Sequence, residues 1–319
     1  MKIIFFGTPN FSSQILKEIS KNNDILCVVT GEDSKQGRGK KIQFPDIKKT
    51  GIELGIPVLQ PKNLKDKIFI KSLQNFNADV FLVIAFRKLP KEVWEIPKKG
   101  TINLHTSLLP EYRGAGPINW VLINGEKTTG VTCFYINEII DQGNIITQKK
   151  ISLDHNITAA QLHNQMIIDG ITIVSETIKQ ITKEKTNTII QSENKDLKKA
   201  PKIHKELLRI NWNEPINKIH NKIRGLSPYL NDNELLKDVS ICPCAWFKLN
   251  NKRVKIQKTS ICEVINNNSR IDTDNKNYLH INFKNKALAL EMIQIEGKKP
   301  MLIKQFLQGN SINSSDEIS

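Results

Sequence analysis

Two polar residues, Asn103 and His105, stand in an otherwise apolar segment at residues 101–105 and are separated by one position. Because side chains alternate along a strand, this spacing places the amide and the imidazole on the same face. A histidine can exchange a proton near neutral pH, and an amide N–H can stabilise an oxygen that becomes negative during a reaction. The pair is therefore a candidate for catalysis, although a buried histidine hydrogen-bonded to a neighbour would show the same pattern.

An irregular loop should follow this strand, because residues 108–118 contain two prolines and two glycines. Open α/β sheets bind their ligands beyond the carboxyl ends of their strands. A second polar segment, residues 137–144, separates two further apolar runs and contains Asp141. An aspartate before Gln-Gly is by itself typical of a turn. An aspartate that reaches back to the end of the first strand would instead join Asn103 and His105 there.

The elements that would position these residues form an α/β pattern. Residues 2–6 are apolar and end at a Gly-Thr-Pro turn, after which apolar residues recur at helical spacing up to residue 19. Further apolar runs are typical of strands in a buried parallel sheet, and an amphipathic segment at 158–181 predicts a long helix. The first domain is predicted to span residues 1–181. The strands expected after the first are residues 25–29, 57–59, 80–85, 101–105, 130–136 and 145–151.

The first turn does not support a nicotinamide site, because its Gly-Thr-Pro-Asn-Phe-Ser sequence has one glycine where the dinucleotide fingerprint needs three. Residues 182–203 are rich in Lys, Thr, Asn and Glu and predict a linker. Short alternating segments within 204–310 predict a small β-barrel domain. The polar residues 311–319 predict a disordered tail.

Composition limits the class of protein. The chain has 319 residues, of which 39% are hydrophobic, so it can bury a sizeable core. No stretch approaches the about 20 consecutive apolar residues that cross a bilayer, and the first segment is too short for a secretory signal, so we expect a cytoplasmic protein with no membrane partner. Five scattered cysteines predict neither a disulfide nor a metal site. The formal net charge of +15 favours contact with polyanions, or reflects a solvated lysine-rich surface.

The residues around Asn103 match a known pattern. The sequence N-x-H-x-S-L-L-P-x-Y-R-G-x-x-P-I, followed by I-D-x-G, resembles the folate-dependent formyltransferases. The resemblance implies a Rossmann-like α/β catalytic domain with a mainly parallel sheet, linked to a smaller C-terminal OB-like β-barrel. It implies Asn103, His105 and Asp141 as catalytic residues, 10-formyltetrahydrofolate as the formyl donor, and no metal. The folate-binding residues that it implies are Ser107, Leu108, Leu109, Pro110, Phe86 and Ile139.

Family membership alone leaves the acceptor open, because enzymes with this core formylate several different amines. The basic loop at 37–41 resembles that of the members that formylate methionyl-tRNA, and so do residues 209–212, 223–228, 294–301 and 306–309. This resemblance implies initiator methionyl-tRNA as the partner of a monomeric enzyme whose cations neutralise tRNA phosphates. The tRNA-binding residues that it implies are Arg38, Lys40, Lys41, Arg224, Lys298 and Lys299.

Some positions depart from the family pattern. The segment at 85–90 is one residue shorter than the common form, and the Asp141 turn carries Ile139, Gln142 and Asn144 where Gly, Thr and Asp are frequent. Residues 229–231 replace the usual Pro-Gly-Ala-Trp. These changes predict a reshaped folate wall and an altered tRNA contact.

Other functions remain open at this stage. They are hydrolysis of formyl-folate, formyl transfer to a small amine, and non-catalytic RNA binding by a degenerate core. Stimulation of turnover by methionyl-tRNA would separate the first two from transfer to tRNA, and the intact Asn103, His105 and Asp141 argue against the third.

Overall fold

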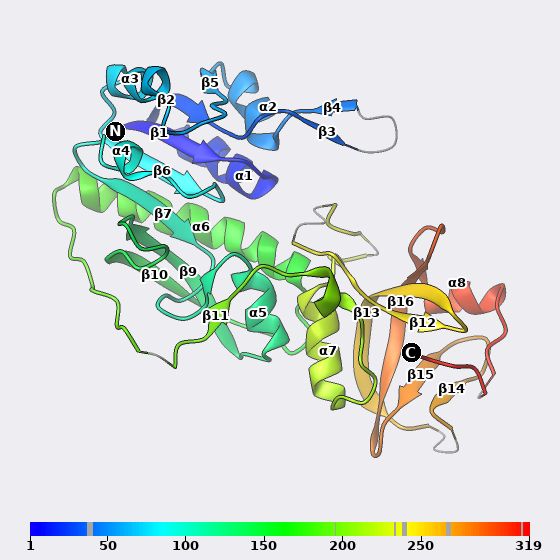
Figure 1. Ribbon diagram of the computed structural model, residues 1–319. Helices are drawn as coiled ribbons and strands as arrows, with labels where there is room; N and C mark the ends of the chain where they lie inside the picture. The colour runs from blue at the N-terminus through cyan, green and yellow to red at the C-terminus, as the bar shows by residue number, and fades with distance from the viewer. Residues whose placement is uncertain (37–40, 195, 233, 238–240, 266–268, 314) are drawn as a thin grey trace. The chain divides into compact units, whose positions relative to one another are not determined.

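The computed structural model describes residues 1–36, 41–194, 196–232, 234–237, 241–265, 269–313 and 315–319 (Figure 1). The chain forms two compact units. The first unit is made of Met1–Gly114, Gly130–Ile151 and Gln165–Lys198, and the second of Ala115–Thr129, Ser152–Asn164 and Lys199–Ser319. The second unit thus takes in two segments that lie within the expected first domain, residues 115–129 and 152–164.

A seven-stranded sheet organises the first unit, in the order β10-β9-β7-β6-β1-β2-β5. The pairs between β7, β6, β1, β2 and β5 are parallel, and β9 runs antiparallel to β7. The mainly parallel α/β fold predicted from the apolar runs is therefore confirmed. The strands are β1 (Lys2–Gly7), β2 (Asp24–Val29), β5 (Val58–Leu59), β6 (Val80–Ile84), β7 (Thr101–His105), β9 (Thr128–Tyr135) and β10 (Ile145–Ser152).

The central strands are covered on both faces. Ile3, Ile4, Phe5 and Phe6 of β1 are all fully buried, which explains why this strand reads as an unbroken apolar run. Two further short strands, β3 (Ser34–Gln36) and β4 (Lys41–Gln43), form a separate antiparallel hairpin. The helices that accompany the sheet are α1 (Asn10–Ile19), α2 (Asp46–Glu53), α3 (Lys67–Asn75), α4 (Lys91–Trp94) and α6 (Ala159–Thr182).

Helix α6 packs closely on β7, the strand that carries the candidate catalytic pair (Figure 1). A Cβ atom at Gly170 of α6 would lie only 2.9 Å from Leu104 Cδ2, so a side chain there would push the helix away from the strand. This close approach holds β7 from one face, while β6 and β9 hold its two edges. The end of β7 is therefore a rigid place for a site.

The second unit is built on an antiparallel sheet in the order β12-β13-β16-β15-β14, with β17 paired to β16. The antiparallel strands predicted for the C-terminal half are confirmed. Closure into the expected barrel is not found among the residues that the structure describes. The strands are β12 (Ala245–Leu249), β13 (Lys252–Glu263), β14 (Ile271–Thr273), β15 (Leu279–Asn282), β16 (Lys286–Ile295) and β17 (Met301–Leu302).

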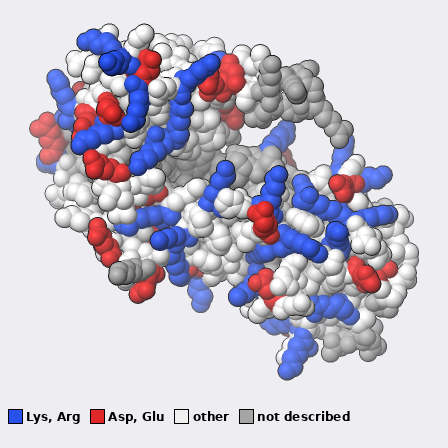
Figure 2. Space-filling model, in the orientation of Figure 1, with Lys and Arg blue, Asp and Glu red and all other residues white. Residues whose placement is uncertain are grey.

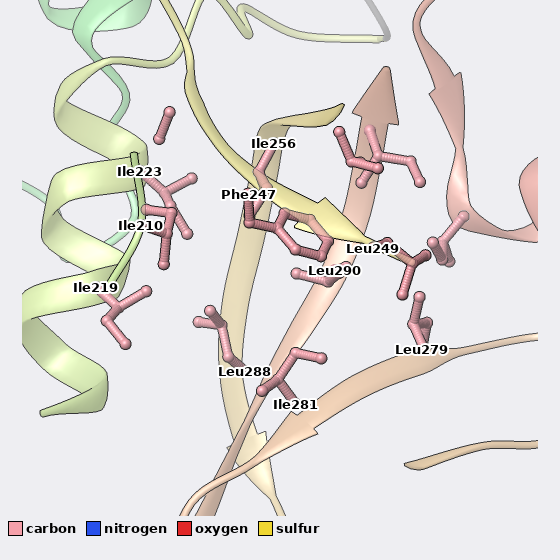
Figure 3. Close-up of a cluster of buried hydrophobic side chains, with 14 of the residues drawn as sticks. Ile210, Ile219, Ile223, Phe247, Leu249, Ile256, Leu279, Ile281, Leu288 and Leu290 are labelled. Atoms are coloured by element: carbon pink, nitrogen blue, oxygen red, sulfur yellow. The ribbon is translucent and has the colours of Figure 1, made fainter. Parts of the chain in front are cut away.

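A single apolar cluster fills the second unit. Figure 3 shows Ile219 and Ile223 of α7 (Ile216–Gly225) with Phe247 and Leu288 of the sheet in this cluster. The ring of Trp212 meets Phe247 edge-on, with centroids 5.2 Å apart. The remaining elements of the chain are α5 (Pro117–Ile123), α8 (Ile303–Gln308), a 3-10 helix (Lys205–Leu208) and the two-residue strands β8 (Arg113–Gly114) and β11 (Lys199–Ala200).

Two segments that composition marks as irregular are held by hydrogen bonds. The C-terminal residues pair with the second unit, because Ser319 and Lys248 exchange backbone hydrogen bonds and Ile312 is buried, whereas a disordered tail was expected. Within the expected linker, Ile189 exchanges two backbone hydrogen bonds with Ile145 of β10. Composition failed to reveal these contacts because single backbone bridges need no apolar periodicity. No described helix is long and apolar enough to cross a membrane.

Candidate active site

Strand β7 ends at His105, and the side chains of Asn103 and His105 lie on one face of it. His105 is 7% exposed and Asn103 is half-buried. The antiparallel register with β9 places Asn103 opposite Phe134 and His105 opposite Thr132. The two polar groups therefore stand at the point where the sheet changes from parallel to antiparallel pairing.

The backbone of the following loop fixes the orientation of the His105 ring. Its Nε2 lies 2.9 Å from the carbonyl oxygen of Tyr112, and because a carbonyl can only accept, Nε2 carries a hydrogen in this arrangement. Tyr112 is buried and has a φ of +60°, an uncommon conformation for a bulky residue. The Nδ1 atom is left as the nitrogen that can take up a proton.

Asp141 reaches back from the β9–β10 turn to the end of β7. Its Oδ2 lies 4.0 Å from His105 Nδ1 and accepts a hydrogen bond of 2.9 Å from the backbone N–H of Gly114. The separation from the ring is too long for a hydrogen bond but places a negative charge beside the imidazole. The Asp141 side chain is only 11% exposed, so water screens this charge little.

A glycine explains how the turn reaches this position. A Cβ atom on Gly143 would lie 1.5 Å from the carbonyl oxygen of Tyr135 at the end of β9, a distance that no side chain tolerates. Asp141 itself has a φ of +57°, which a short polar side chain accepts more readily than most. The I-D-x-G pattern is thus the signature of a turn folded tightly against β9.

Sequence reasoning missed one residue of this site. Gln191, from the expected linker, is 6% exposed and donates hydrogen bonds to the backbone oxygens of Asp141 and Gly143. Its oxygen accepts from the guanidinium of Arg113. Partial burial lowers the pKa of Arg113 from its ordinary value, and the charge of Asp141 opposes that shift. The only sequence signal was an apolar Ile-Ile pair directly before Gln191.

The loop after β7 is held by its own hydrogen bonds. Ser107 is fully buried and its hydroxyl donates to the oxygen of Glu111 at 2.6 Å, while Leu109 packs into a small core cluster with Phe134. The peptide bond from Leu109 to Pro110 is cis. Ser107 and Leu109 therefore shape the loop from inside. Leu108 and Pro110 are half-buried, and the Leu108 side chain packs closely on Gly130.

Phe86 and Ile139, the other expected wall residues, do not themselves line the cavity of about 630 Å³ in the first unit. The cavity is lined by their chain neighbours, including Arg87, Leu89 and Glu138. Phe86 is half-buried with its ring 5.7 Å from that of Phe6, and Ile139 is 54% exposed. The cavity has the size of a small-molecule site. Its lining includes neither residues 107–110 nor Phe86 and Ile139, so the expected folate wall stays a prediction.

Comparison with known families assigns the chain. The formyl transferase domain matches residues 1–178, and the formyl transferase C-terminal domain matches residues 202–311. The chain belongs to the formyl transferase family. The candidate catalytic residues Asn103, His105 and Asp141 all lie within the first of these domains.

Several curated proteins resemble this formyl transferase along almost its whole length. The methionyl-tRNA formyltransferase of Flavobacterium johnsoniae is 41% identical, with 99% of this chain and 98% of the relative covered. The methionyl-tRNA formyltransferase of Thermodesulfovibrio yellowstonii is 42% identical, over 98% of this chain and 96% of the relative. The similarity therefore includes both units.

Solved structures share the fold at lower identity. An N-formyltransferase from Helicobacter canadensis, in complex with folinic acid and dTDP-3-aminofucose, aligns with a TM-score of 0.63 and 21% identity over 91% of this chain and 98% of its own. HypX from Aquifex aeolicus, in complex with tetrahydrofolic acid, aligns with a TM-score of 0.62 and 16% identity over 96% of this chain and 47% of its own. At such identities the likeness concerns the fold alone.

The residues expected to bind tRNA differ in what the structure says of them. Arg38 and Lys40 lie outside the described residues, and Lys41 begins β4. Arg224 of this formyl transferase is only 4% exposed, and its guanidinium donates to Asn221 Oδ1 at 2.8 Å. Burial lowers the pKa of Arg224 to about 10, and the charge of Asp154 partly opposes the shift. Arg224 is therefore held inside the second unit, and its guanidinium offers little surface to a tRNA phosphate.

Lys298 and Lys299 remain accessible. Both are exposed in the turn after β16, where the N–H of Lys298 donates to the oxygen of Ile295 and Gly297 takes a φ of +77°. Figure 2 shows that Lys and Arg side chains outnumber Asp and Glu on the visible face of both units. This excess agrees with the formal net charge of +15 and gives the surface a long-range attraction for polyanions.

Proposed function

We propose that this formyl transferase moves the formyl group of 10-formyltetrahydrofolate to the α-amine of methionine esterified to initiator tRNA. The observation that carries the proposal is the convergence of Asn103, His105 and Asp141 at the end of β7. The acceptor is inferred from relatives 41% and 42% identical over nearly the full chain that are named methionyl-tRNA formyltransferases. The donor is inferred from the same family and from the folate compounds bound to two structural neighbours.

The catalysed step joins the amine nitrogen to the formyl carbon and breaks the bond from that carbon to N10 of the folate. Attack by the neutral amine creates a tetrahedral species with a negative oxygen. The Asn103 amide is a donor that can bind this oxygen, and His105, on the same face of β7, becomes a second donor once its Nδ1 has taken up the amine proton. Because both sit on a strand held at both edges, they need little rearrangement as the charge develops.

Protons must also balance in this step. The amine loses one proton when it becomes an amide, and N10 gains one as it leaves. With Nε2 of His105 donating to Tyr112, Nδ1 is the position that takes up and returns the proton. Asp141, 4.0 Å from Nδ1, stabilises the charged ring between these events.

For the donor, the cavity lined by Arg87 and Glu138, the chain neighbours of Phe86 and Ile139, supports the proposal of a folate site in the first unit. Leu108 and Pro110, the half-buried residues of the loop after β7, are proposed to complete the wall. The exposed Ile139 offers an apolar surface to the flat folate ring.

For tRNA, Arg38, Lys40, Lys41, Lys298 and Lys299 are proposed to contact backbone phosphates. Such contacts are electrostatic, so binding should weaken steeply as salt rises. The enzyme is proposed to act as a monomer.

One assay tests this function directly. Purified protein is given 10-formyltetrahydrofolate and charged initiator tRNA, and the product is scored for formylmethionine. Uncharged tRNA and free methionine serve as controls. Formylmethionine that forms only with charged tRNA supports the proposal. Equal release of formate with and without tRNA would identify a formyl-folate hydrolase, and formylation of free methionine would identify a transferase for small amines.

A further inference from the structure

The segment that follows α6, which contains Ile189 and Gln191, makes hydrogen bonds within the first unit. Ile189 exchanges backbone hydrogen bonds of 2.8 Å in both directions with Ile145, the first residue of β10. Two residues later the chain delivers Gln191, which is 6% exposed although residues 192–194 beside it are exposed. An uncharged polar side chain that is buried within a polar segment needs partners, because a buried amide without hydrogen bonds is costly.

Both ends of the Gln191 amide are fully used. Its nitrogen donates to the backbone oxygens of Asp141 at 3.0 Å and Gly143 at 2.8 Å. Its oxygen accepts from Nε of Arg113 at 3.0 Å and from Nη2 of Arg113 at 2.7 Å. A side-chain amide has two donor hydrogens and two acceptor lone pairs, so this geometry satisfies all four.

These bonds tie the turn that carries Asp141 to the strand that receives its carboxylate. Gly114, the neighbour of Arg113, donates its N–H to Asp141 Oδ2 at 2.9 Å. Asp141 is thus held at two places: its side chain by Gly114 and its backbone by Gln191. Nearby, the Arg113 guanidinium sets a positive charge near the carboxylate.

We propose that Gln191 is a positioning residue for formyl transfer, which keeps the Asp141 carboxylate at its working distance from His105. The proposal rests on the proposed function in taking Asp141 as part of the catalytic machinery. The turn has a left-handed residue at Asp141, and nothing in its own short sequence forces that conformation. The Gln191 amide supplies the external bonds that stabilise it.

The decisive variant is Gln191→Glu. It keeps the length of the side chain and an oxygen for Arg113, but it replaces the donor nitrogen with an oxygen that faces the carbonyls of Asp141 and Gly143. Asn194→Asp is the matched control, because it adds the same negative charge three positions along the same segment. Asn194 is exposed, and the Asp side chain keeps the oxygen that accepts from the N–H of Asp196.

The measurements are kcat, the KM for each substrate, and the pH profile of kcat, with methionyl-tRNA and 10-formyltetrahydrofolate. We expect Gln191→Glu to lower kcat at least about 10-fold with both KM values within about twofold of the parent, and to displace the pH profile, because Asp141 no longer sits at a fixed distance from His105. Asn194→Asp should match the parent. The positioning role would be overturned if Gln191→Glu left kcat and its pH profile unchanged, or if it raised KM without lowering kcat.

A second readout does not depend on the acceptor. The titration of the His105 imidazole, followed by NMR in the whole protein, should shift between the parent and Gln191→Glu but not in Asn194→Asp. If the parent protein formylates no tRNA, the proposed function fails. The positioning role is then still decided by whether Gln191→Glu changes the His105 titration relative to the parent. If Gln191→Glu is unfolded at the assay temperature, Gln191→Asn, which keeps the amide on a shorter stem, is measured by the same two criteria.

Discussion

The imidazole Nδ1 of His105 lies 4.0 Å from the Asp141 carboxylate, while the other ring nitrogen is held by the Tyr112 carbonyl. The two side chains come from different parts of the chain, the end of β7 and the turn between β9 and β10. The antiparallel register carries β9 away from the end of β7, since Tyr135 pairs with Ile102, and the turn after β9 brings the Asp141 carboxylate back to His105. The ring is thus oriented by the backbone, and a carboxylate lies beside its Nδ1 atom.

Removing either partner should slow the chemical step without preventing folding. We expect His105→Ala to lower kcat by a factor of about 10² to 10³, because the reaction loses an oxyanion donor and a proton carrier. Asp141→Asn should lower kcat by about 10² or more, since it keeps an oxygen for the Gly114 N–H but removes the charge. Steady-state formylation together with separate donor and tRNA binding assays checks both. Near-normal turnover in both variants would remove this pair from the mechanism.

Gly143 should tolerate no side chain. Gly143→Ala would put a Cβ atom 1.5 Å from the Tyr135 carbonyl oxygen, so the turn carrying Asp141 must move. We expect a loss of about 1–3 kcal/mol of stability, as is typical of overpacking, together with a large fall in kcat. Gly309→Ala is the control, because nothing lies within 4 Å of its Cβ position. Thermal unfolding and kcat measure the two effects, and equal behaviour of the two variants would contradict the geometry.

Acid should destabilise the second unit through His220. Burial, with the nearby charges of Arg224 and His155 as smaller causes, lowers the pKa of His220 to about 4, whereas an unfolded histidine titrates near about 6.5. Above the unfolded value neither state is protonated, so stability is unaffected by this group. As the pH falls from about 6.5 to about 4, the unfolded state takes up the proton first, and stability falls by about 3 kcal/mol.

The His220→Gln variant tests this pH dependence. Its stability should fall less steeply over the same pH range, while the exposed His204→Gln control should follow the parent. Urea unfolding of the whole chain, followed by tryptophan fluorescence at a series of pH values, gives the comparison. Parallel curves for the parent and His220→Gln would show that another group governs the acid response.

Lys298 and Lys299, the exposed residues after β16, should contribute to tRNA binding but not to donor binding. We expect the double change Lys298→Gln with Lys299→Gln to raise the KM for tRNA and to reduce the salt dependence of binding by about one unit of slope per lost phosphate contact. A control double change at Lys284 and Lys286 removes the same charge from a different hairpin. Tight binding of tRNA to both variants, with unchanged salt slopes, would be evidence against a contact at Lys298 and Lys299.

Much of this protein could be predicted from its residues alone. The unbroken apolar run of β1 and the N-x-H spacing in β7 indicate buried strands and a shared face, because strand periodicity is local. The mainly parallel first sheet was predicted in this way and is confirmed. The formyl transferase family was predicted from the resemblance of the motifs around Asn103 and Asp141, and it is confirmed as well. The proposed roles of Asn103, His105 and Asp141 remain predictions until the variants are measured.

The tertiary structure alone decided the contacts between segments that no local sequence pattern links. Arg224 is buried inside the second unit. Its sequence position, a basic residue at the end of a helix, could not predict this burial, because lysine and arginine side chains are mostly exposed to solvent. Gln191 lies in a segment whose composition suggests a linker, yet it binds Asp141 and Arg113. Periodicity reports which face of an element is buried. The partner of a single buried polar group depends on how distant segments meet, and that is set by packing of the whole chain.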